Sequence, residues 1–212
     1  MASSRPVAAE LATIRVHGIS REAFLVRSVL AAAAAYGTMS ASALVGRALA
    51  QSRGGDVDIL NFALTLEYLE STFYTLAVKE VGALSSGEQQ LARRLRDDED
   101  AHVDALTATI KQLGGQPAAK PAFDFGGAFG GRAAFLKTAS TLEDTGVSAY
   151  NGAATSISSV DVLAAAAGIV QTEARHAALI RLARDKTPAP QPFDKASQME
   201  EALAAVQPFI TA

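Results

Sequence analysis

The sequence has 212 residues, which suits one globular domain with extensions. It contains no cysteine, and this excludes disulfides, iron–sulfur ligation by cysteine and thiol catalysis. The formal net charge of −3, without a lysine-rich tail, argues against nucleic acid as a partner. Hydrophobic residues make up 49% of the chain and alanine is abundant, so we predict an all-α fold with a sizeable core.

Residues 1–55 have the features of a degenerate twin-arginine export signal. The sequence ISREAFL at 19–25 precedes an alanine-rich apolar run at 29–45 and an A-x-A sequence at 48–50, of the kind that a signal peptidase cuts. Glu22 replaces the second arginine of the pair, so two predictions stay open. A working signal would place this bacterial protein in the periplasm or at the cell surface. A retained helical arm would leave it in the cytoplasm and favour homo-oligomers, because monomers seldom expose such a patch.

The next region, 56–186, begins with two amphipathic helices. A first helix is expected from Asp56, which can cap it, to Gly82. Ser85 and Glu88 have the spacing of a capping box and predict the beginning of a second helix, which ends at the glycines 114–115. The short connection between the two helices predicts a tight hairpin.

A second hairpin is expected after an irregular stretch at 116–131, whose Pro and Gly exclude regular structure and whose phenylalanines predict packing against the helices. The third helix begins near Arg132, and the fourth is capped by Ser158 with Asp161. A proline-rich strap with one short amphipathic helix follows at 187–212. Two hairpins joined by a long crossover predict a four-helix bundle.

The helices carry one pattern of residues twice: a glutamate, a tyrosine seven residues later, and a Glu-x-x-His sequence on the next helix. The first copy is Glu67, Tyr74, Glu99 and His102, and the second is Glu143, Tyr150, Glu173 and His176. Residues three apart on a helix face the same way, so each Glu-x-x-His presents a carboxylate and an imidazole to one point. Four helices with these residues can hold two divalent ions, and the mixed ligands suit Fe or Mn, although Zn can also bind.

We therefore predict two iron ions, or alternatively Mn or Zn. The predicted ligands are Glu67, Glu99, His102, Glu143, Glu173 and His176. Glu70 rivals Glu67, as a ligand or as a base behind the ligands. Tyr74 and Tyr150 either pack in the core or hydrogen-bond to a ligating glutamate. The alternative is a metal-free bundle in which some glutamates point outward, because four buried carboxylates without a cation would repel one another. Asp97, Asp98 and Asp100 are expected to be solvated.

With these motifs, residues 57–184 resemble the ferritin-like superfamily, and in particular the bacterial ferritin-like domain proteins described as desiccation-related. The sequence DVDILNFALTLEYLESTFY is similar to the opening of that family, and both Glu-x-x-His sequences match its metal-binding helices. The resemblance implies a ferritin-like four-helix bundle with a di-iron or dimanganese site and the six ligands named above. It does not imply a cage-forming iron store, since both terminal segments depart from the ferritin chain.

Several functions fit this site, and whether the protein is an enzyme stays open. The first is a ferroxidase or peroxide-scavenging oxidoreductase, in which dioxygen or peroxide reacts at the metal ions. The second is a self-assembling structural protein, in which the metal only holds the helices together. A manganese catalase-like enzyme ranks third. A DNA-protecting miniferritin ranks last, because its metal sites lie between subunits and its basic tail is missing here.

Overall fold

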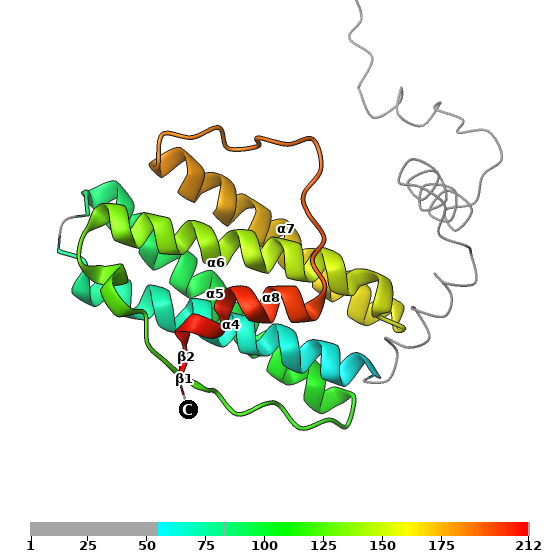
Figure 1. The fold of residues 1–212 in the computed structure, drawn as a ribbon. Helices are drawn as coiled ribbons and strands as arrows, with labels where there is room; N and C mark the ends of the chain where they lie inside the picture. Colours follow the sequence, from blue (N-terminus) through cyan, green and yellow to red (C-terminus); the bar gives the residue numbers. More distant parts are fainter. Residues whose placement is uncertain (1–54, 83, 212) are drawn as a thin grey trace, which may run out of the picture. The chain divides into compact units, whose positions relative to one another are not determined.

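The computed structural model describes residues 55–82 and 84–211. The predicted signal or arm at 1–55 lies outside these residues apart from Gly55, so its role stays a prediction. Within the described part, four long helices form a bundle (Figure 1): α4 Gly55–Glu80, α5 Ser86–Gln112, α6 Arg132–Ala153 and α7 Val160–Ala183. The predicted all-α bundle is confirmed.

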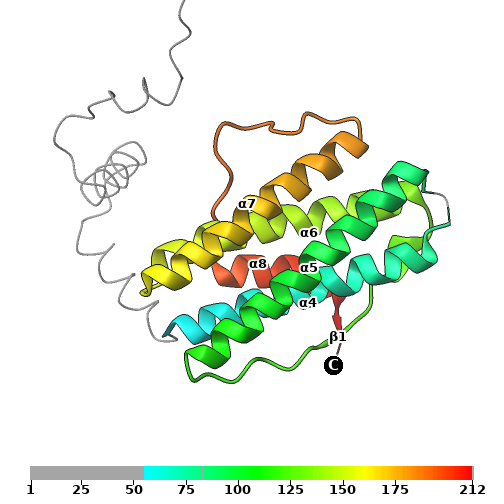
Figure 2. The ribbon, with the colours of Figure 1, turned by 180° about the vertical axis from the view of Figure 1, so that it is seen from behind.

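The helices pair as two hairpins. α4 packs along α5 and α6 along α7, which Figures 1 and 2 show from opposite sides. The crossover between the hairpins contains β1 (Ala122–Phe123) and the 3-10 helix η1 (Gly126–Phe129), and a 3-10 turn η2 (Ala154–Ser156) joins α6 to α7. This is the predicted order of two tight connections and one long crossover.

The C-terminal segment closes over the bundle. After α7 an irregular strap leads to the predicted short helix, α8 (Met199–Val206), which packs on α6. The 3-10 turn η3 (Gln207–Phe209) and strand β2 (Ile210–Thr211) follow, and β2 pairs antiparallel with β1 in the register Phe123↔Ile210. The two-residue strands therefore tie the end of the chain to the crossover, a contact that the sequence analysis did not predict.

Aromatic rings fill one end of the core. The buried Phe73 ring lies 5.2–5.6 Å, centroid to centroid, from four other rings. These belong to Tyr74, Phe125, Phe129 and Phe135. Because Phe125 and Phe129 come from the crossover, the prediction that this irregular stretch packs on the helices is confirmed.

Helix caps agree with the sequence at one position and differ at two others. Ser85 and Glu88 form the predicted capping box at α5. At α7 the N-cap is Ser159, whose hydroxyl accepts from Val162 N, so the predicted cap at Ser158 is one residue early. Asp56 lies inside α4, and its carboxylate accepts from the backbone N–H groups of Ser158 and Ser159 at 2.7 and 2.8 Å. It therefore joins the beginnings of α4 and α7.

The strap crosses α6 very closely at Gly152. Ser197 N donates a hydrogen bond to Ser148 O at 2.8 Å. A Cβ at position 152 would lie 1.8 Å from Ser197 O, so only glycine fits this crossing.

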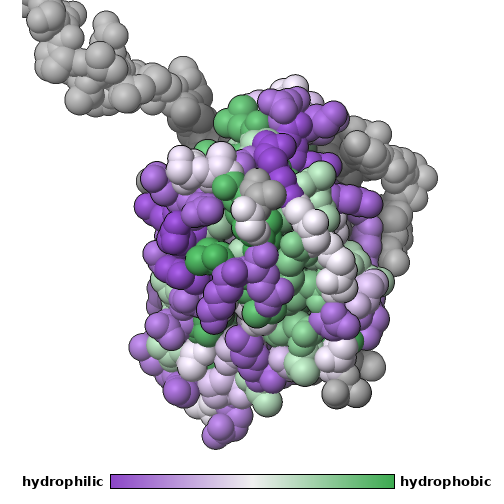
Figure 3. Space-filling model, turned by 90° about the vertical axis from the view of Figure 1, so that its left-hand side faces the viewer, coloured by the Kyte–Doolittle hydropathy of each residue, from purple (hydrophilic) through white to green (hydrophobic). Residues whose placement is uncertain are grey.

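The surface of the described part mixes polar and apolar residues. On the face in Figure 3, hydrophilic residues surround smaller hydrophobic areas. None of the helices in the described ranges has the length and apolar character needed to cross a membrane.

Candidate metal centre

Helical spacing points two equivalent sets of side chains into the bundle. On α4, Glu67 and Tyr74 lie two turns apart and are fully buried. On α6, Glu143 and Tyr150 have the same spacing, and both are buried, with 6% of Tyr150 exposed. The paired Glu-x-x-His side chains come from α5 and α7 and are buried as well: Glu99, His102, Glu173 and His176. The structure thus brings together all six residues that were predicted as ligands.

The six residues form two groups of four that share two members. In the first group, one potential ligand atom from each of Glu67, Glu99, His102 and Glu173 lies within 4.8 Å of every other. In the second group the same holds for Glu99, Glu143, Glu173 and His176. Glu99 and Glu173 belong to both groups, so the two glutamates of the Glu-x-x-His sequences occupy the centre. Glu67 with His102 and Glu143 with His176 lie at the two ends.

Each imidazole turns its Nδ1 toward the carboxylates. His102 Nδ1 lies 2.9 Å from Glu99, 3.1 Å from Glu173 and 3.2 Å from Glu67. His176 Nδ1 lies 2.8 Å from Glu99 and 3.5 Å from Glu143. The two rings are stacked with their centroids 6.2 Å apart. Both histidines therefore face the same small volume, from α5 and from α7.

The tyrosines connect the two hairpins crosswise. Tyr74 on α4 donates to Glu143 on α6, and Tyr150 on α6 donates to Glu67 on α4 at 2.5 Å. The sequence left two roles open for these tyrosines, core packing or a hydrogen bond to a ligating glutamate. In the structure both hydroxyls bond to candidate ligands, while their rings pack in the core. Each bond fixes one carboxylate oxygen of an end glutamate and leaves the other to face the site.

Asp98 was predicted to be solvated, and this is wrong. Its carboxylate lies 3.2 Å from Nε2 of His176 and 2.7 Å from Arg94. Partial burial opposes ionisation, but these contacts with Arg94 and His176 outweigh it and lower the pKa of Asp98. A carboxylate in this position orients the imidazole, as is usual behind metal-ligating histidines. The partner lies on another helix, which spacing within one helix cannot reveal, whereas Asp97 and Asp100 are exposed as expected.

Charge is concentrated in this buried volume. The pKa values of Glu70 and Glu173 are raised well above the ordinary value of a glutamate. Burial is the largest cause, and repulsion from the neighbouring carboxylates is the next. Burial also raises the pKa of Glu99 to about 7, although its contacts with the histidines oppose the rise. Burial alone would lower the pKa of His102, but its contacts with Glu173, Glu67 and Glu99 raise it to about 12. Carboxylates and imidazoles therefore compensate one another in part.

The donor atoms fit a pair of divalent cations. Seven buried side-chain atoms in the described ranges lack a hydrogen-bond partner of good geometry. They are both carboxylate oxygens of Glu70 and of Glu173, Glu99 Oε1, Glu143 Oε2 and His176 Nδ1. A buried polar atom without a partner costs free energy. A cation bound among these seven atoms would remove that cost. Oxygen donors with two imidazole nitrogens suit Fe, Mn or Zn.

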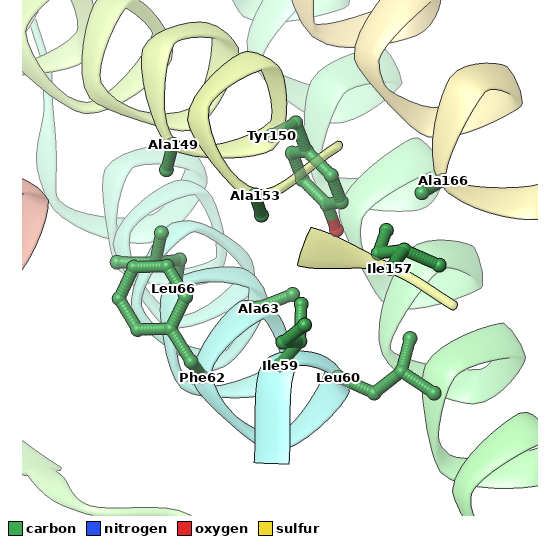
Figure 4. A pocket seen from close by; sticks show the side chains of 10 residues that line it. All are labelled: Ile59, Leu60, Phe62, Ala63, Leu66, Ala149, Tyr150, Ala153, Ile157 and Ala166. Carbon is green, nitrogen blue, oxygen red and sulfur yellow. The ribbon is translucent and has the colours of Figure 1, made fainter. Parts of the chain in front are cut away.

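A small apolar pocket lies beside this centre. Its lining comes from α4, the end of α6, the connection that follows η2, and α7, and includes Ile59, Phe62, Ala63 and Ile157 (Figure 4). The hydroxyl oxygen of Tyr150 is the polar atom among the labelled side chains, and the same hydroxyl contacts Glu67. With a volume of about 10 Å³ the pocket is barely large enough for one water-sized molecule.

The fold and this centre define a class: a four-helix bundle with buried carboxylate and histidine groups that could hold metal ions. Comparison with protein families agrees, because the model of the family described as Ferritin-like domain matches residues 55–186. The chain belongs to this ferritin-like family. A comparison with curated protein sequences gave no match.

Proposed function

We propose that the protein binds two iron ions in this centre and is a ferritin-like oxidoreductase that reacts with dioxygen or peroxide. The observation that carries the proposal is the pair of four-residue groups that share Glu99 and Glu173. Six side chains from four helices are arranged so that two cations can share two carboxylates. Manganese or zinc would use the same donors, and iron is preferred on the resemblance to the ferritin-like proteins.

The residues of the chain have distinct tasks in this proposal. Glu99 and Glu173, which belong to both groups, would serve both ions, while Glu67 with His102 and Glu143 with His176 would each hold one. Tyr74 and Tyr150 fix the end glutamates, and Asp98 orients His176. When bound, two ferrous ions would supply two electrons to dioxygen or peroxide. The apolar pocket next to Tyr150 is far too small for a large organic substrate.

The test is anaerobic titration of the metal-free protein with Fe(II), followed by air. We expect about two equivalents to bind, and the absorbance of ferric iron to rise faster after air than in a protein-free solution of the same Fe(II) concentration. An absorbance trace that matches the protein-free solution would refute the oxidoreductase. Loading with Mn(II) and adding hydrogen peroxide separates the catalase-like alternative, which predicts rapid oxygen release.

A second candidate is self-assembly on the same bundle, with a metal that only stabilises the helices. It is favoured by apolar side chains that α7 leaves in solvent, since Val160 is 77% and Leu182 53% exposed. In this proposal residues 1–50 drive association. Deleting them should lower the number of subunits per particle, obtained from light scattering, and an unchanged number of subunits would exclude the arm as the cause.

The resemblance to desiccation-related proteins adds a physiological proposal. Removal of Fe(II) and of peroxide would limit oxidative damage, so the activity fits a role in stress protection. Export to the periplasm or cell surface belongs to the same proposal and depends on whether residues 1–50 work as a signal.

A further inference from the structure

The two halves of the centre follow one register, and two positions break it. Glu67 and Tyr74 are each 76 residues before Glu143 and Tyr150, and the Glu-x-x-His sequences are 74 residues apart. By the first offset the counterpart of Glu70 is Gly146, and by the second the counterpart of Asp98 is Thr172. The chain therefore has a carboxylate in one half where the other half has none, at both positions.

Gly146 leaves the space into which Glu70 extends. A Cβ built on Gly146 would lie 3.4 and 3.6 Å from the two carboxylate oxygens of Glu70 and 3.0 Å from Glu173 Oε2. Glycine inside a helix costs about 1 kcal/mol relative to alanine. Its presence within α6 fits a position where a Cβ would be tight against the Glu173 carboxylate and in ordinary van der Waals contact with that of Glu70. The Glu70 carboxylate thus faces the same volume as the central Glu173.

Glu70 has no other evident partner. The residue is 2% exposed, and neither carboxylate oxygen has a hydrogen-bond partner among the described residues. Glu67 and Glu143, in contrast, each accept from a tyrosine. A buried carboxylate that serves only packing would be costly, because burial without partners disfavours the charged group. Because Glu70 lies beside the candidate metal ligands, a bound cation would pair with its carboxylate.

The second break concerns the histidines. His176 has Asp98 behind it at 3.2 Å. The position equivalent to Asp98 is Thr172, whose hydroxyl donates to Gly168 O and accepts from Arg175. An imidazole with a carboxylate behind it is a stronger ligand than one without. The two ends of the centre therefore differ in their histidines as well.

We propose that Glu70 is an additional metal ligand, a fifth carboxylate that makes the two metal positions unequal in affinity. The proposal rests on the proposed dimetal function and adds a seventh residue to the six predicted ligands. In this proposal Glu67 and Glu70 are both ligands, so neither of these two residues on α4 replaces the other.

The test is titration of the metal-free protein with Mn(II), in which the electron paramagnetic resonance signal of unbound Mn(II) gives the free concentration. The wild type should bind two ions with unequal affinities. In Glu70→Gln one of the two ions should bind at least about tenfold more weakly, as expected for loss of a charged group at a metal site. The matched control is Glu80→Gln, an exposed acid on the same helix, which should bind like the wild type.

A second measurement separates ligation from packing. Without metal, Glu70→Gln should melt at a higher temperature than the wild type, because a neutral amide replaces a buried carboxylate without partners. Circular dichroism verifies folding, and Glu70→Ala replaces the glutamine variant if that one fails to fold. Two ions bound by Glu70→Gln with wild-type affinities would overturn this inference and leave the proposed function intact. A wild type that binds no Mn(II) and no Fe(II) would overturn both.

Discussion

Replacing Glu99 or Glu173 by glutamine is expected to abolish the binding of both metal ions. Each of these two glutamates belongs to both four-residue groups, whereas Glu67 and Glu143 belong to one group each. Substitution of residues that merely support ligands already costs 10–100-fold in affinity, so loss of a shared ligand should cost more than about 100-fold at both positions. Glu67→Gln or Glu143→Gln should weaken mainly one ion.

Metal content after anaerobic loading with Fe(II) and dialysis measures this difference. The expected ratios of metal to protein are two for the wild type, close to zero for Glu99→Gln and Glu173→Gln, and near one for the end variants. Asp97→Asn is the matched control on α5, because its side chain is 62% exposed and the change removes one charge next to the site sequence. If Glu173→Gln still bound two ions, the inference that both metal positions depend on Glu173 would be wrong.

Replacing Phe73 by alanine is expected to lower the free energy of unfolding by about 3–5 kcal/mol. The Phe73 side chain is fully buried, and its ring contacts rings from its own helix, from the crossover and from α6. Its loss leaves a cavity in the part of the core where these three elements meet, and the surrounding structure can relax only in part.

Urea unfolding of the metal-free protein, followed by circular dichroism, measures the change. Phe193→Ala is the control, since Phe193 is 87% exposed and its truncation should change stability by no more than about 0.5 kcal/mol. A loss below about 1 kcal/mol for Phe73→Ala would contradict the assignment of this ring cluster as the part of the core that joins the crossover to the bundle.

The bundle was readable from the sequence because local signals and global fold agree. Apolar periodicity located four helices, and the capping box at Ser85 gave the beginning of α5 correctly. The predicted cap at Asp56 was wrong, because its carboxylate accepts from the backbone N–H groups of Ser158 and Ser159, which belong to a distant part of the chain. The pairing of β1 with β2 joins residues almost ninety positions apart, which no local pattern reports.

The candidate centre was predictable in its members and not in its internal order. Spacing within each helix predicted that the six donors point into the bundle, and the structure brings them together there. Which glutamates are central depends on how the hairpins dock, and this placed Glu99 and Glu173 between the two ends. The roles of Asp98 and Gly146 likewise depend on contacts between helices, and Gly146 has no side chain to draw attention in a sequence.

The shared glutamates have a consequence for how the protein assembles its site. Each hairpin contributes three members of one four-residue group and takes the fourth from the other hairpin: Glu173 completes the first group and Glu99 the second. The hairpins form from neighbouring stretches of chain, whereas their docking must close the long crossover, so it is the slower event to organise. Neither hairpin alone can complete a metal position. Under the proposed function, metal uptake would therefore require the two hairpins to dock, and any motion that parts them would release both ions together.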